Sequence, residues 1–143
     1  MTQALAASLL AFAVVAPLPV SAAEKVVQLT LDGRPVARSG VVAVSRDGLV
    51  YADVIDLVKS FDGLLTLHGD AVVVSIRAKT ATLTAGSRTM KINQGSIVMP
   101  GQAFKRGGEI FVPLEAFVRN VAGAKVTIDA AQSHADIAVS AAP

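Results

Sequence analysis

The stretch KRGGEIFVPLEAFVRNVAG, residues 105–123, contains the strongest fold signals in this chain. A glycine pair at Gly107-Gly108 is typical of a tight turn with positive φ, and a short apolar run follows it. After Pro113 the apolar residues recur at the three- and four-residue spacing of an amphipathic helix. Gly123 then stands where a helix usually ends. The stretch therefore predicts a strand that leads directly from a tight turn into one short helix.

A similar stretch, SRDGLVYADVIDLVKSFDG, occurs earlier at residues 45–63. Residues 46–63 align with residues 106–123 without a gap, and most apolar positions keep their character. Four positions carry the same residue in both copies: Arg46 and Arg106, Gly48 and Gly108, Val58 and Val118, Gly63 and Gly123. In the first copy Asp53 can cap the helix, and Pro113 holds the matching position, where a proline at the helix start is tolerated.

The repeat organises the whole chain. Residues 24–76 and 77–139 form two halves, followed by a tail at 140–143. Alternating strands such as TATLT (80–84) and turn signals such as Asp32-Gly33 make each half rich in β-structure. We expect an α+β fold with two β-rich repeats, each an antiparallel sheet with one short amphipathic helix packed across it.

The first 23 residues, MTQALAASLLAFAVVAPLPVSAA, carry no charged side chain and end in small residues. This layout predicts a secretory signal peptide, cleaved after Ala22 or Ala23. A retained membrane anchor is the alternative, but Pro17 and Pro19 shorten the apolar run below the roughly 20 residues of a spanning helix. We expect a periplasmic or secreted protein of the cell envelope with no stable membrane span once the signal is removed.

Composition excludes several classes of site. The 143-residue chain has no cysteine, so disulfides, thiolate nucleophiles and cysteine-type zinc sites are ruled out. Its formal charge of +2 and its scattered basic residues do not favour nucleic-acid binding. Aromatic residues make up only 4% of the chain, so we expect an aliphatic core. No cofactor is expected.

The candidates for chemistry are few. His68 and His134 are the only histidines, and each stands near an aspartate in a predicted turn between the last strands of its half. They are the basis of one alternative function, a small metal-binding protein or enzyme of the envelope, although three ligands are the usual minimum. Asp53 and Asp56 form a second candidate pair, but helix capping and a solvated surface account for them. Tyr51 is predicted to be a core or boundary residue rather than a catalytic one.

Specific motifs in the second half suggest a family. They are Ala85-Gly86-Ser87, Ile92-Asn93, Arg106-Gly107-Gly108, FVPLE at 111–115, Gly123-Ala124 and VTID at 126–129. In this order they resemble the copper amine oxidase-like N-terminal domain, a stalk-like domain of secreted bacterial proteins. The first half resembles it more weakly, since Ala52-Asp53 replaces a valine-proline pair.

The resemblance implies a narrow function. In the amine oxidases this domain is an appended stalk, and copper chemistry belongs to a separate, larger catalytic domain. We therefore expect a non-catalytic binding or scaffolding module of the cell envelope, with peptidoglycan or an envelope protein as partner. Arg46 and Arg106 are the candidate surface contacts, because they are shared by both copies and have no evident folding role. An open sheet edge could also support self-association.

Overall fold

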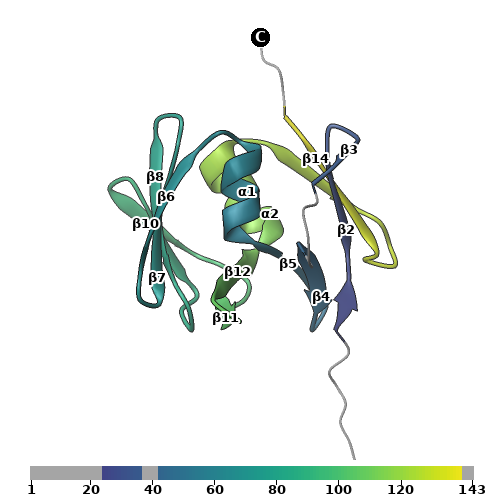
Figure 1. The fold of residues 1–143 in the computed structure, drawn as a ribbon, viewed down its shortest axis with the longest axis horizontal. Coiled ribbons are helices and arrows are strands. Elements are labelled where there is room, and N and C mark those ends of the chain that lie inside the picture. The colour runs from purple at the N-terminus through teal and green to yellow at the C-terminus, as the bar shows by residue number, and fades with distance from the viewer. Residues whose placement is uncertain (1–23, 37–41, 140–143) are drawn as a thin grey trace, which may run out of the picture.

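The computed structural model describes residues 24–36 and 42–139, so the predicted signal peptide and the C-terminal tail lie outside the described residues. The described part contains three β-sheets grouped around two helical segments (Figure 1). Helix α1 spans Val54–Ser60. Helix α2 spans Leu114–Phe117 and continues directly into a π-helical turn, η2, at Val118–Ala122.

The central sheet has the strand order β1-β4-β5-β12-β11. Its strands are β1 (Lys25–Val26), β4 (Ala43–Arg46), β5 (Leu49–Asp53), β12 (Glu109–Pro113) and β11 (Phe104–Arg106). Two hairpins build it, and both turn through a pair of residues with positive φ, Asp47-Gly48 and Gly107-Gly108. This is the two-residue turn that the sequence predicts. The hairpins join where β5 pairs antiparallel with β12, with Ala52 opposite Val112.

Two side sheets flank the helices, one to the left and one to the right in Figure 1. The first side sheet has the order β10-β9-β8-β7-β6. Its strands are β6 (Leu64–His68), β7 (Ala71–Ile76), β8 (Lys79–Thr84), β9 (Thr89–Ile92) and β10 (Gly95–Val98). The second side sheet has the order β13-β14-β2-β3. Its strands are β2 (Gln28–Leu31), β3 (Arg34–Pro35), β13 (Lys125–Ile128) and β14 (His134–Ala138).

Each sheet contains strands from both halves of the chain. In the second side sheet, β14 pairs in parallel with β2, whereas the other strand pairs of the described residues are antiparallel. The first side sheet likewise extends β6 and β7 with β8 to β10. The fold is therefore α+β with mainly antiparallel sheets, as predicted, but the arrangement of one separate sheet for each half is not confirmed. The reason is that strand edges pair with whichever strand folding brings beside them, and sequence similarity does not specify that partner.

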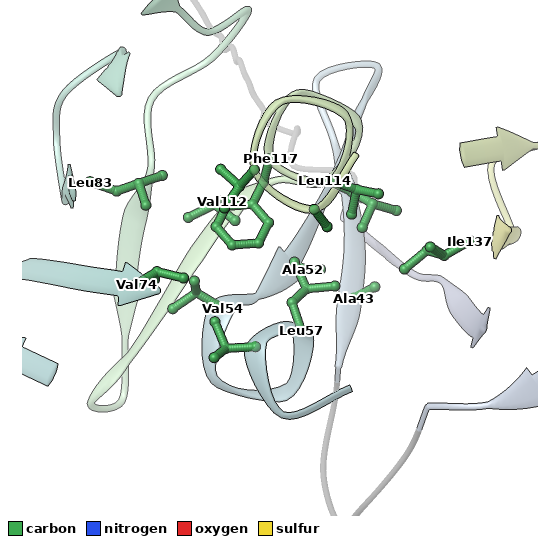
Figure 2. Close-up of a cluster of buried hydrophobic side chains, with 14 of the residues drawn as sticks. Ala43, Ala52, Val54, Leu57, Val74, Leu83, Val112, Leu114, Phe117 and Ile137 are labelled. Carbon is green, nitrogen blue, oxygen red and sulfur yellow. The ribbon is translucent and has the colours of Figure 1, made fainter. Parts of the chain in front are cut away.

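One hydrophobic core connects the three sheets and both helical segments. Ala52 and Val112 of the central sheet lie in this core together with Phe117 of α2 (Figure 2). Val74 reaches the same cluster from the first side sheet, and Ile137 reaches it from the second. All five side chains are completely buried. This shared core holds the short helices, which would be marginal in isolation.

The helix starts agree with the sequence, but the helix ends differ from each other. Asp53 caps α1, and its carboxylate accepts a hydrogen bond from the backbone N–H of Ile55 at 2.9 Å. At the end of α1 the left-handed conformation is taken by Asp62 (φ 58°), whereas in the second copy it is taken by Gly123 (φ 70°). These two residues are not equivalent in the alignment. The wider turn η2 holds the additional residue that separates them.

Gly63 follows the end of α1, but unlike Gly123 it does not have a positive φ. The requirement for glycine comes from close packing instead. A Cβ atom at position 63 would lie 2.7 Å from the carbonyl oxygen of Ser75 and 2.8 Å from Cγ1 of Ile76. The chain leaving α1 thus passes against β7 with no room for a side chain.

Candidate binding surface

The outer face of the central sheet, opposite the helices, carries an aromatic cluster. Along β5 and β12 the side chains alternate, so Tyr51 and Phe111 point away from the main core and form a second small cluster. Phe104 on β11 pairs with Phe111, and their rings stack with centroids 5.3 Å apart. The ring of Tyr51 meets Phe104 edge-on at 5.0 Å. This cluster gathers three of the six aromatic residues of the chain.

Both predicted surface arginines lie over this cluster. Arg46 is the last residue of β4 and Arg106 the last of β11, each directly before its turn. The guanidinium carbon of Arg46 is 4.1 Å from the centre of the Phe104 ring, and that of Arg106 is 5.3 Å from it. Arg106 also lies 5.6 Å from the centre of Phe111. Contacts of this kind at exposed sites contribute about 0.5–1 kcal/mol each.

A single carboxylate lies between the two arginines. Arg106 donates a hydrogen bond through Nη2 to Oε2 of Glu24, and Nε of Arg46 is 3.6 Å from the same oxygen. The hydrogen bond from Arg106 holds the pKa of Glu24 below its usual value, and the positive charges of Arg106 and Arg46 add to this effect. The arginine side chains remain 42% and 44% exposed, so the group is open to solvent.

A shallow hollow of about 370 Å³ adjoins this group and is lined by Arg46, Asp47, Tyr51, Gln102 and Phe104. The loop before β11 forms part of its wall. There Gly101 lies so close to Tyr51 that an added Cβ atom would overlap the phenol oxygen. Burial raises the pKa of the Tyr51 phenol, so this hydroxyl stays protonated near neutral pH.

The sequence identified only part of this surface. It singled out Arg46 and Arg106 through the repeat, but it missed Phe104 and Glu24. Phe104 could have been found by extending the alignment two residues, because positions i and i+2 of a strand share a face. Glu24 could not, because its contact depends on β1 pairing with β4, and no local pattern specifies that pairing.

A buried carboxyl group lies near one edge of the same face. Asp53 is only 2% exposed, and burial is the main cause that raises its pKa to about 7. The neighbouring Glu109 carboxylate adds to this effect by its charge and by sharing a hydrogen bond with Asp53, and the charge of Asp56 adds to it too. The helix-capping role predicted for Asp53 is confirmed by its hydrogen bond with the backbone N–H of Ile55. The carboxylate that acts most strongly on Asp53 is Glu109, not its helix neighbour Asp56.

Comparison with known protein families shows which family this chain belongs to. Residues 26–137 match the family described as copper amine oxidase N-terminal domain. The chain belongs to this family. The matched residues include the turns that follow Arg46 and Arg106 and strands of all three sheets. The match confirms the resemblance seen in the sequence. No curated protein and no solved structure matches the chain.

The matched region is a copper amine oxidase N-terminal domain, and no oxidase catalytic domain is matched. Within residues 24–36 and 42–139, no group of three or more His, Asp or Glu side chains could hold a metal ion. These residues therefore do not provide a ligand set for the copper in the family's name. In the same part of the chain, no helix is long and apolar enough to span a membrane.

The two histidines of this copper amine oxidase N-terminal domain lie on different sheets. His68 is the last residue of β6 in the first side sheet, and His134 is the first residue of β14 in the second (Figure 1). Both are strand residues rather than turn residues, which corrects the sequence prediction. Nε2 of His134 is 3.2 Å from the hydroxyl oxygen of Thr30, and that hydroxyl donates to Asp136 at 2.5 Å. His134 therefore takes part in a local network that joins β14 to β2.

Proposed function

We propose that this chain is a non-catalytic binding or scaffolding module that works in the cell envelope, outside the cytoplasm. It contacts its partner through the surface formed by Arg46, Arg106 and Phe104. The observation that carries this proposal is the convergence of two arginines, from equivalent positions in the two hairpins, on one aromatic ring while both stay accessible. Arginine is among the residues that most often dominate binding energy at interfaces, and phenylalanine is enriched at interfaces relative to the rest of the surface.

The location outside the cytoplasm rests on residues 1–23 and their resemblance to a signal peptide. Expression in a bacterial host tests it. The protein recovered from the periplasm or medium should begin at Ala23 or Glu24 when its N-terminus is sequenced. Recovery of the full-length chain from the cytoplasm alone would contradict this part of the proposal.

Peptidoglycan is the first partner to test, by sedimentation of the purified protein with isolated cell wall. The wild-type protein should be retained, and the Arg46→Ala/Arg106→Ala variant should be lost to the supernatant. Arg34→Ala/Arg119→Ala is a matched control, since it removes the same charge from exposed positions elsewhere. Equal retention of both variants would show that the arginine surface is not used. Absence of wild-type retention would eliminate the wall and leave an envelope protein as the partner.

The other function expected from the sequence was a metal-binding protein or enzyme that uses His68 and His134. Their placement on separate sheets gives no support to a shared site. Zinc and copper titration of the wild-type protein and of a His68→Ala/His134→Ala variant should give the same result. Stoichiometric binding that disappears in the variant would overturn the non-catalytic proposal in favour of the metal function.

We also propose that the two halves are related repeats. The support is the register of β5 and β12, which places Ala52 opposite Val112, the residue that matches it in the alignment. A local two-fold relation between the hairpins follows from this pairing. It explains why Arg46 and Arg106 approach the same ring from opposite edges of the hairpin pair.

Self-association through strand β6 is a second candidate contact. This strand lies at the edge of the first side sheet, and Leu64 and Leu67 on it are 76% and 47% exposed. An exposed apolar edge strand is a template for pairing with another chain. A Leu64→Lys/Leu67→Lys variant should have a lower average mass than the wild type in light scattering at high concentration. A wild-type protein that is monomeric throughout would remove this candidate.

A further inference from the structure

We propose that the arginine pair is a binding site for a carboxylate of an acidic peptide segment, and that Glu24 occupies this site as a replaceable internal ligand. This inference rests on the proposed binding function and specifies its ligand. It starts from the two guanidinium groups, which approach the same oxygen of Glu24 from strands at opposite sides of the two hairpins. A carboxylate is thus the chemistry that the site already accepts.

The guanidinium groups have donors left for an incoming ligand. Each carries five N–H groups in a planar fork that suits two-point contact with a carboxylate. Among the described residues, Glu24 is the only ion-pair or hydrogen-bond partner of the Arg46 and Arg106 side chains; their remaining contacts are to aromatic rings. Two positive charges therefore share one negative charge. The rings beneath them hold the guanidinium planes in place without competing for their donors.

The attachment of Glu24 is weak enough to be exchanged. It precedes β1, a two-residue strand at the edge of the central sheet, and both residues of that strand are exposed. Val26 is 63% exposed, so releasing this strand gives up little apolar burial. Short edge segments with few buried contacts open most readily. The segment can therefore withdraw Glu24 while the two hairpins and the aromatic cluster stay folded.

The adjoining hollow limits what can accompany the carboxylate. Asp47 lines it beside Arg46, and its negative charge disfavours a second acidic group there. Gln102 and the edge of Phe104 offer an amide and an apolar surface instead. A peptide with one acidic side chain flanked by neutral residues fits this environment better than a polyanion does.

The test is an NMR titration of the arginine side-chain N–H signals with the peptide acetyl-Ala-Glu-Ala-amide. The Gln-containing peptide is the matched ligand control. The Glu24→Gln variant should bind the acidic peptide about threefold to fivefold more tightly than wild type, which is the gain expected from removing a partly exposed competing ion pair. Arg46→Lys/Arg106→Lys should bind it more weakly, because lysine does not offer the planar fork. Thermal unfolding of each variant establishes that it is folded.

Each outcome decides the matter. Tighter binding by Glu24→Gln, specific for the Glu peptide, supports the inference. Equal binding of the Glu and Gln peptides, unchanged affinity in Glu24→Gln, or no binding by either protein overturns it. Cell-wall sedimentation distinguishes failure of this inference from failure of the proposed function. If retention on the wall depends on the two arginines but the peptide does not bind, the proposed binding function still holds and only the carboxylate ligand is refuted. If the Glu24→Gln variant is also retained more strongly on the wall, the ligand carboxylate comes from wall peptides. If the variant binds only the free peptide more tightly, the ligand carboxylate comes from an acidic protein segment.

Discussion

Replacing Asp53 with Asn should change how the stability of this protein depends on pH. Asp53 is 2% exposed, caps α1, and faces the Glu109 carboxylate, and its pKa is raised from 3.8 to about 7. Between these two values the folded protein holds a proton at Asp53 that the unfolded chain has released. By linkage, the free energy of unfolding must therefore fall as pH rises from about 4 to about 7.

The size of the effect follows from the two pKa values. Each unit of difference corresponds to about 1.4 kcal/mol, so the rise from 3.8 to about 7 corresponds to an upper bound of about 4 kcal/mol. The Asn side chain keeps the oxygen that caps Ile55 and can donate to Glu109 as neutral Asp53 does. We expect the Asp53→Asn variant to equal the wild type near pH 4 and to exceed it by about 2–4 kcal/mol at pH 8.

Other carboxylates make the protein less stable at acidic pH. Hydrogen bonds lower the pKa of Glu24, Asp129 and Asp136 in the folded protein. A lowered pKa has the opposite sign, so the stability from these groups is present above about pH 4 and is lost as the pH falls below it. The wild type should thus be most stable near pH 4–5. In the Asp53→Asn variant the stable range should extend to pH 8.

Urea unfolding followed by far-UV circular dichroism at pH 3–8 measures these profiles. Asp62→Asn is the matched control, because it removes the same charge from an exposed position just after the same helix. Parallel profiles for wild type and Asp53→Asn would refute the reasoning, since they would mean that Asp53 binds no extra proton in the folded state. A variant that is less stable than wild type at pH 8 would refute it as well.

Two further predictions concern packing, and both can be checked by denaturant unfolding. Gly63→Ala should lower the free energy of unfolding by about 1–3 kcal/mol, because its Cβ atom would overlap the Ser75 carbonyl oxygen. Gly95→Ala should change it little, because the nearest atom to its added Cβ is the Ile92 carbonyl oxygen at 4.0 Å, an ordinary contact distance. An equal effect at both positions would contradict the close approach at Gly63. Phe117→Ala should cost about 3–5 kcal/mol, since this side chain is completely buried between the sheets. Leu64→Ala, at a position that is 76% exposed, is its control and should stay within about 0.5 kcal/mol of wild type.

Local sequence signals determined the individual elements of this protein. Gly107-Gly108 predicted a tight turn because glycine adopts positive φ readily, and the structure confirms this turn and shows the equivalent one at Asp47-Gly48. The cap at Asp53 was predictable for a similar reason, since it involves a backbone N–H two residues away. The family resemblance rested on the same short motifs and was confirmed over residues 26–137.

Tertiary structure decided how these elements are combined. The parallel pairing of β14 with β2 joins the two ends of the described chain, and no residue in either strand specifies its partner. The same holds for the candidate binding surface. Arg46, Arg106 and Glu24 lie far apart in the sequence and meet only because three strands of the central sheet bring them to one face. The sequence by itself determined the turns, the helices and the apolar faces, because these depend on neighbouring residues. The meeting of distant charges depends on the path of the whole chain, and only the folded structure contains that path.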